Sequence, residues 1–119
     1  MRNKLFAGLL VTFASSLAVA QSPQLLPPEG QPLLLTGTVR LGNGKYAHGN
    51  YTVIELDRAS RSPCNGKTVR DILLWNADVG DPMLLARFVD QRIVVRGTIN
   101  CPNSGIQFSA DPSQAFRVY

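Results

Sequence analysis

Few residues of this chain could take part in a chemical reaction, and they lie close together in the sequence. His48, the single histidine, lies in a glycine-rich stretch, where it could act as a general acid or base. Glu55 and Asp57 alternate in the next apolar run and Asp71 follows in the one after, and paired carboxylates can hydrolyse glycosides. No nucleophile elbow or Ser-x-x-Lys pair accompanies them. A solvated loop histidine and a solvated strand face account for the same residues, so we expect no enzyme.

Aromatic side chains lie among these polar residues and favour binding over catalysis. Tyr46 and Tyr51 flank His48, and we expect both on the surface, where they could stack on a sugar, a base or a partner's side chain. Trp75 follows Ile72-Leu73-Leu74, which favours a core position for its ring over the alternative of a binding position. The residues that we expect to bind a ligand are Tyr46, His48, Tyr51, Arg70 and Trp75.

Cys64 and Cys101 are the two cysteines of the chain. In an oxidising compartment such a pair predicts a disulfide, with two free thiols as the alternative. The loop between them is long, so a bridge would stabilise the fold by about 3–4 kcal/mol. Two Cys and one His cannot complete a structural zinc site, and we expect neither a metal nor a cofactor. Four cations lie around Cys64, namely Arg58, Arg61, Lys67 and Arg70. They could form a modest cationic rim for an acidic partner, or they could serve only to keep the domain soluble.

Most of the elements that must position these residues are predicted strands. Apolar and polar side chains alternate, and clusters of Gly, Asn and Pro separate the alternating runs. Gly37 and Gly97 lie in the middle of two such runs, where a glycine indicates a bulge or a strand that coils tightly. The pattern predicts four strands and two shorter β segments, the latter separated by Asp111-Pro112: residues 33–41, 51–57, 68–75, 92–101, 106–110 and 116–119.

One segment between the third and fourth strands has a helical pattern instead. Asp81 is a good N-cap, and Pro82 suits the first helical position. Leu84, Leu85 and Phe88 follow at helical spacing. We therefore predict one short amphipathic helix over residues 81–90.

This order of elements, β-β-β-α-β-β, resembles that of an OB-fold, a five-stranded Greek-key barrel with a helix between its third and fourth strands. The glycine strands around Thr36–Arg40 and Arg96–Asn100 suit such a barrel, and the resemblance covers residues 33–119. The stretch Leu84–Thr98 is also similar to small bacterial periplasmic OB-like proteins, which have Gly-Lys where this chain has Asp90-Gln91. The resemblance implies a ligand surface on the outer face of the second and third strands.

The N-terminus predicts export. Arg2 and Lys4 precede the apolar segment Leu5–Leu17, and Ala18-Val19-Ala20 provides the small residues that signal peptidase accepts. We predict a signal peptide over residues 1–20 and a periplasmic or secreted protein, with a retained membrane anchor as the alternative. The proline-rich leader over residues 21–32 is expected to be a mobile spacer, with a docking strand as the alternative.

Composition narrows the class of partner. The chain has 12 basic and 8 acidic residues, and the loss of Arg2 and Lys4 with the signal leaves a net charge of +2. No run of Lys or Arg follows residue 20, which argues against a nucleic-acid partner. We expect a monomer, with no membrane span once the signal is removed.

These observations predict an exported, non-catalytic binding module of the cell envelope, whose ligand is a protein, a glycan or a small molecule. The first alternative is an inhibitor or immunity-type protein that blocks an envelope enzyme, and the second is a small hydrolase built on His48, Glu55 and Asp71. A deep pocket with converging carboxylates would favour the hydrolase. A protruding loop over residues 42–50 would favour the inhibitor, and a shallow aromatic groove would favour a glycan or small-molecule binder.

Overall fold

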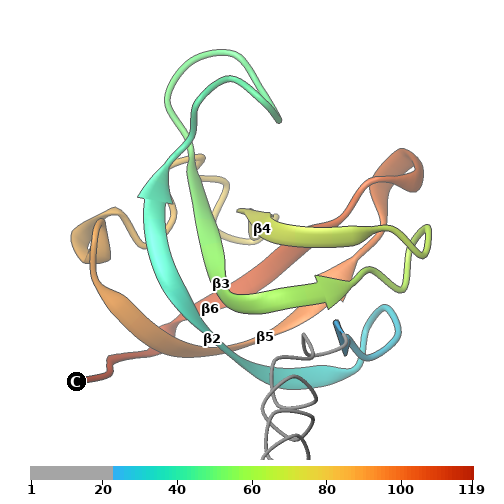
Figure 1. The fold of residues 1–119 in the computed structure, drawn as a ribbon. Coiled ribbons are helices and arrows are strands. Elements are labelled where there is room, and N and C mark those ends of the chain that lie inside the picture. Colours follow the sequence, from blue (N-terminus) through green and yellow to red (C-terminus); the bar gives the residue numbers. More distant parts are fainter. Residues whose placement is uncertain (1–22) are drawn as a thin grey trace, which may run out of the picture.

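The computed structural model of this chain describes residues 23–119, so the predicted signal peptide and the first two residues of the leader lie outside the described part. The described residues are mostly β, as predicted, with 52% of them in strands and almost no helix. Figure 1 shows the strands as one strongly curved sheet. The elements are β1 (Gln24–Leu25), β2 (Pro32–Leu41), β3 (Thr52–Arg61), β4 (Thr68–Leu74), η2 (Ala86–Phe88), β5 (Arg92–Asn100), η3 (Pro102–Ser104) and β6 (Gln107–Arg117).

Five of the six strands pair in a ring. The order in the sheet is β1-β3-β2-β5-β6-β4, and β4 pairs again with β3. The β2 strand pairs with β5 over its first half and with β3 over its second half, because it curves through the whole sheet. The β4–β6 pairing is parallel, whereas the other pairings of the ring are antiparallel. The remaining strand, β1, adds to β3 in parallel.

The C-terminal strand differs from its prediction. Two short segments were expected with a break at Asp111-Pro112, but β6 runs continuously from Gln107 to Arg117. Its register against β5 shifts between Val95 and Gly97, so that residues 111–114 form a bulge outside the regular pairing. A proline is tolerated there because a bulged residue need not donate a ladder hydrogen bond.

The predicted helix over residues 81–90 is wrong. The Asp81 carboxylate does accept a hydrogen bond from the Met83 N–H, at 2.9 Å, but Leu85 has a left-handed φ of 63° and only a short 3-10 turn follows. The Leu84 carbonyl bonds instead to the buried Thr52 hydroxyl on β3, at 2.6 Å. The apolar residues at helical spacing thus reach the core through a turn that β3 holds in place.

The leader is docked, which corrects the expectation of a mobile spacer. Gln24 and Leu25 pair with Ser60 and Arg61 of β3. Leu26 is 2% exposed and belongs to the core. The Gly30 N–H donates to the Ile99 carbonyl at 3.0 Å, so the leader also contacts β5.

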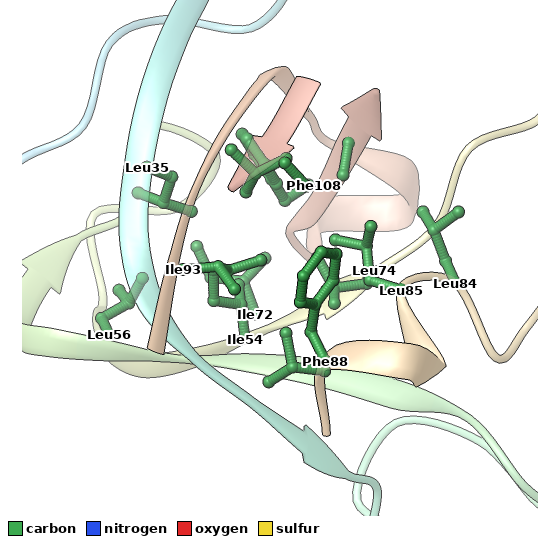
Figure 2. Packing of buried hydrophobic residues seen from close by; sticks show 14 of the residues in the cluster. Leu35, Ile54, Leu56, Ile72, Leu74, Leu84, Leu85, Phe88, Ile93 and Phe108 are labelled. Atoms are coloured by element: carbon green, nitrogen blue, oxygen red, sulfur yellow. The ribbon is translucent and has the colours of Figure 1, made fainter. Parts of the chain in front are cut away.

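The core fills the inside of the ring. Leucine, isoleucine and phenylalanine side chains from all sides of the sheet meet there, and Phe88 of η2 packs among them (Figure 2). Gly37 and Gly97 mark two places where neighbouring strands approach closely. A Cβ at Gly37 would collide with the Glu55 carbonyl, and one at Gly97 with the Ser109 carbonyl. Both glycines therefore have the structural role that their mid-strand positions predict.

The predicted disulfide is confirmed. Cys64 and Cys101 are bonded, with their Cα atoms 5.4 Å apart. Cys64 lies in the turn between β3 and β4, and Cys101 directly follows β5. The bond therefore joins the β3–β4 hairpin to a strand that β3 does not contact directly in the sheet.

Candidate functional site

The loop over residues 42–50 joins β2 to β3 and extends away from the sheet, at the top of Figure 1. The side chain that fixes its course is Tyr51, which is only 2% exposed. The Tyr51 hydroxyl oxygen accepts hydrogen bonds from the N–H groups of Gly44 and Tyr46, both at 3.0 Å. A rigid buried ring at the base of the loop thus holds two of its backbone donors.

A second set of contacts ties the loop to β4. The Tyr46 hydroxyl donates to a carboxylate oxygen of Asp71 at 2.6 Å, and Lys45 Nζ forms an ion pair with the same oxygen at 3.0 Å. Lys45 Nζ also lies 5.0 Å from the centroid of the Tyr46 ring, and the Tyr46 and Tyr51 rings meet edge to face at 6.5 Å. We call Lys45, Tyr46, Tyr51 and Asp71 the loop clamp.

The clamp changes the acidity of its members. Partial burial, followed by the hydrogen bond to Asp71, raises the pKa of Tyr46 to about 12. The hydrogen bond to the Asp71 carboxylate raises the pKa of Lys45 as well. Near neutral pH the clamp therefore contains a neutral phenol and a charged ammonium group, both bound to one carboxylate.

Next to the clamp, the outer face of the sheet carries paired charges. Arg40 on β2 contacts Asp90 at 2.8 Å and Glu55 on β3 at 3.5 Å. Arg92 on β5 binds both carboxylate oxygens of Asp57 on β3, with a shortest distance of 2.6 Å. The register explains the ion pairs that involve β3. Outward-facing residues of β3 and β5 lie on either side of the middle of β2, so their charged side chains can meet across it. Each of these charges has an opposite charge beside it, so this face is close to neutral.

A small hollow lies between the loop and this charged face. Its volume is 160 Å³, about half the roughly 300 Å³ at which small-molecule pockets begin. Polar and aliphatic residues line it, and no aromatic side chain does: Arg40, Leu41, Gly42, Asn43, Val53, Glu55 and Asp71. The hollow is therefore smaller than the pocket expected for the hydrolase, and it lacks the stacking surface expected for a glycan binder.

The structure brings some of the predicted site residues together and separates others. Tyr46 is half-buried in the clamp, and His48 is exposed further along the same loop. Tyr51 is buried, so the expectation that its ring lies on the surface is wrong. Arg70 is exposed on β4, where the register against β3 is irregular. Trp75 is half-buried after the end of β4, and its backbone N–H donates to the Phe108 carbonyl at 3.1 Å.

Two residues of the clamp were not predicted as site residues. Asp71 appeared only as a candidate catalytic carboxylate, and Lys45 was not singled out. The sequence signal for Lys45 is slight, since a lysine next to a tyrosine in a glycine-rich loop is common. Its partner Asp71 is 26 residues away in the sequence, and only the pairing of β3 with β4 brings the carboxylate under the loop.

Neither a metal site nor a membrane span is found in residues 23–119. No group of three or more His, Cys, Asp or Glu side chains within that range could hold a metal ion. No helix there is long and apolar enough to cross a membrane. Comparisons with protein-family models, with curated proteins and with solved structures gave no match to this chain.

Proposed function

We propose that this protein is an exported, non-catalytic binding module with an OB-like Greek-key barrel, which binds a protein partner through the loop over residues 42–50. The ring order β2-β3-β4-β6-β5 supports the OB-like interpretation, because in an OB-fold the first strand also pairs with both the second and the fourth. The predicted signal peptide supports export to the periplasm or the medium.

The observation that carries the proposal is a protruding loop held in one shape. Loops on a rigid scaffold are common binding elements, and a loop that is already ordered loses little entropy when it binds. The clamp orders the base of the loop, while Ala47, His48, Gly49 and Asn50 stay exposed. A protein partner suits such a projection better than a small molecule does, because the neighbouring hollow is small and has no aromatic lining.

The experiment uses the chain from Gln21 as bait in an extract of the cell envelope. The loop variant carries His48→Ala and Asn50→Ala, which change two exposed side chains and leave the clamp intact. The control variant carries Ser113→Ala and Gln114→Ala in the exposed bulge of β6. We expect one protein to be retained by the wild type and the control but not by the loop variant, and direct titration with that protein should show the same order. Equal retention by all three baits would contradict binding through the loop.

The same protrusion favours a second candidate, an inhibitor or immunity-type protein that inserts the loop into the cleft of an envelope enzyme. The retained protein distinguishes the two. If it is an enzyme, an equimolar amount of the wild type should abolish its activity, and the loop variant should leave that activity intact. Binding without any loss of activity would exclude the inhibitor and leave the binding module.

A further inference from the structure

The far end of β3 carries a different surface from the loop end. Register places Leu25 of β1, Arg61 of β3 and Thr68 of β4 in one row across three strands. All three are exposed, and Leu25 is 70% exposed. Their neighbours Ser60 and Val69 face the other way, since Ser60 is 2% exposed and Val69 packs against the core. One face of this corner of the sheet therefore presents a leucine beside an arginine.

Two more cations flank the row. Lys67 and Arg70 lie on either side of Thr68, and both are exposed. The segment from residue 58 to residue 70 contains four Arg or Lys residues and no Asp or Glu. Within residues 23–119, no ion pair is formed by Arg61, Lys67 or Arg70. We call Leu25, Arg61, Lys67, Thr68 and Arg70 the hairpin face.

One carboxylate near this end has another role. Glu29 of the leader accepts a hydrogen bond from the Cys101 N–H at 2.7 Å. That bond directs its carboxylate to the backbone beside the disulfide. Within residues 23–119, Glu29 forms no ion pair with the cations of the hairpin face.

The turn that carries these cations is firmly held. The Ser62 N–H donates to the Lys67 carbonyl at 2.9 Å, and the Gly66 N–H donates back to the Ser62 carbonyl at the same distance. The disulfide from Cys64 to Cys101 fixes the turn to the end of β5. The positions of the cations are thus set by the fold, which makes the patch a preorganised surface rather than a flexible basic tail.

We propose that the hairpin face docks on an anionic lipid surface. Cations near a membrane bind lipid phosphates, and an exposed leucine among them can enter the boundary between headgroups and acyl chains. A nucleic acid would use the cations but would leave Leu25 without an apolar partner.

Docking in this way would also leave the binding loop free. The loop over residues 42–50 joins β3 at Thr52, whereas the hairpin face lies at the other end of β3, at Arg61. In Figure 1 the loop extends at the top, and the β3–β4 connection lies at the right near the blue β1. The proposal does not depend on the identity of the loop's partner, because it concerns other residues.

The test is binding to lipid vesicles by the chain from Gln21, which contains every core residue from Leu26 to Ala115. We expect co-sedimentation with mixed phosphatidylglycerol and phosphatidylcholine vesicles, weaker binding as salt is added, and none with phosphatidylcholine alone. The variant Arg61→Gln/Lys67→Gln/Arg70→Gln should bind at least about tenfold more weakly.

A matched variant controls for net charge. Arg87→Gln/Arg96→Gln/Arg117→Gln removes three exposed cations from other parts of the surface and should bind as the wild type does. Leu25→Ser should weaken binding by at least about threefold, because it removes the apolar contact. A thermal melt of each variant confirms that it is folded.

Three outcomes would overturn the proposal. The first is no binding of the wild type to anionic vesicles, and the second is an equal loss in the two triple variants, which would reflect net charge alone. The third is binding to duplex DNA or heparin but not to vesicles, which would assign the face to a soluble polyanion.

Discussion

The two ends of β3 carry connections that are fixed by different means. At the Thr52 end, the loop over residues 42–50 is held by the hydroxyl of a buried tyrosine and by one carboxylate of β4. At the Arg61 end, the turn to β4 is fixed by a covalent bond to Cys101. The first device depends on polar groups with the right protonation state, whereas the second does not. We therefore expect a change of pH to loosen the loop end long before it affects the hairpin end.

The two ends of β3 also differ in how their charged side chains are paired. Near the loop, Arg40, Lys45 and Arg92 each pair with a carboxylate, so the face is close to neutral. Surface ion pairs of this kind are screened by solvent and add little to stability, so they shape the face more than they stabilise it. At the hairpin face, Arg61, Lys67 and Arg70 form no ion pair with any carboxylate of residues 23–119. A surface that leaves its charges uncompensated is suited to an external partner of opposite charge.

The largest effect should come from removing the disulfide. Cys64→Ala/Cys101→Ala should lower the free energy of unfolding by about 3–4 kcal/mol, because the unfolded chain regains the freedom of a long loop. Urea unfolding measures the change. Reductant should destabilise the wild type to a similar extent and leave the variant unchanged. A loss well under about 1 kcal/mol would show that the hairpin end is held by packing alone.

A smaller loss of stability is expected from substitutions in the ring of strands that lies between the loop end and the hairpin end of β3. Gly37→Val and Gly97→Val each place a side chain against a carbonyl of the neighbouring strand, so each should cost about 1–3 kcal/mol through displaced backbone. Thermal melts of the two variants test this. Melting temperatures equal to that of the parent would contradict the close approach of the strands.

At the loop end, Tyr51→Phe should cost about 1–2 kcal/mol. The substitution keeps the buried ring but removes the oxygen that accepts from Gly44 and Tyr46. Amide hydrogen exchange should become faster at these two residues and stay unchanged in the turn around Cys64. Faster exchange at both ends would mean that the two connections are not independent.

The smallest effect concerns alkaline pH. The pKa of Tyr46 is raised from 10.0 to about 12, so the folded state favours the protonated phenol. The resulting stabilisation is present below pH 10 and is lost as the pH rises towards 12. Phenolate absorbance should show the Tyr46 titration in this upper range, and Tyr46→Phe should remove it. Persistence of that titration in the variant would assign it to another tyrosine.

The sequence predicted best those features that depend on local pattern or on simple pairing. Alternation located β2 and β5 to within a residue at each end, because a strand that is buried on one side must repeat every two residues. Gly37 and Gly97 were predicted to be structural because each lies in the middle of a strand, where a small closed barrel must coil tightly. Two cysteines allow one intramolecular bond, so the disulfide needed no knowledge of the fold beyond the expectation of export.

Features that depend on distant residues could not be predicted in this way. The spacing of Leu84, Leu85 and Phe88 suits a helix and a turn equally well, and it was Thr52, far away in the sequence, that bound the Leu84 carbonyl. The aromatic pattern likewise could not show that Tyr51 lies beneath its own loop.

The sequence by itself therefore determined the mostly β character of the chain, the positions of most strands and the cysteine pairing, because each of these follows from local periodicity or from composition. Only the tertiary structure decided the rest. It docked the leader with Leu26 in the core, placed Asp71 under Tyr46, and aligned Leu25 with Arg61. These contacts join residues from separate strands, and their energies exist only once the sheet has brought those strands together.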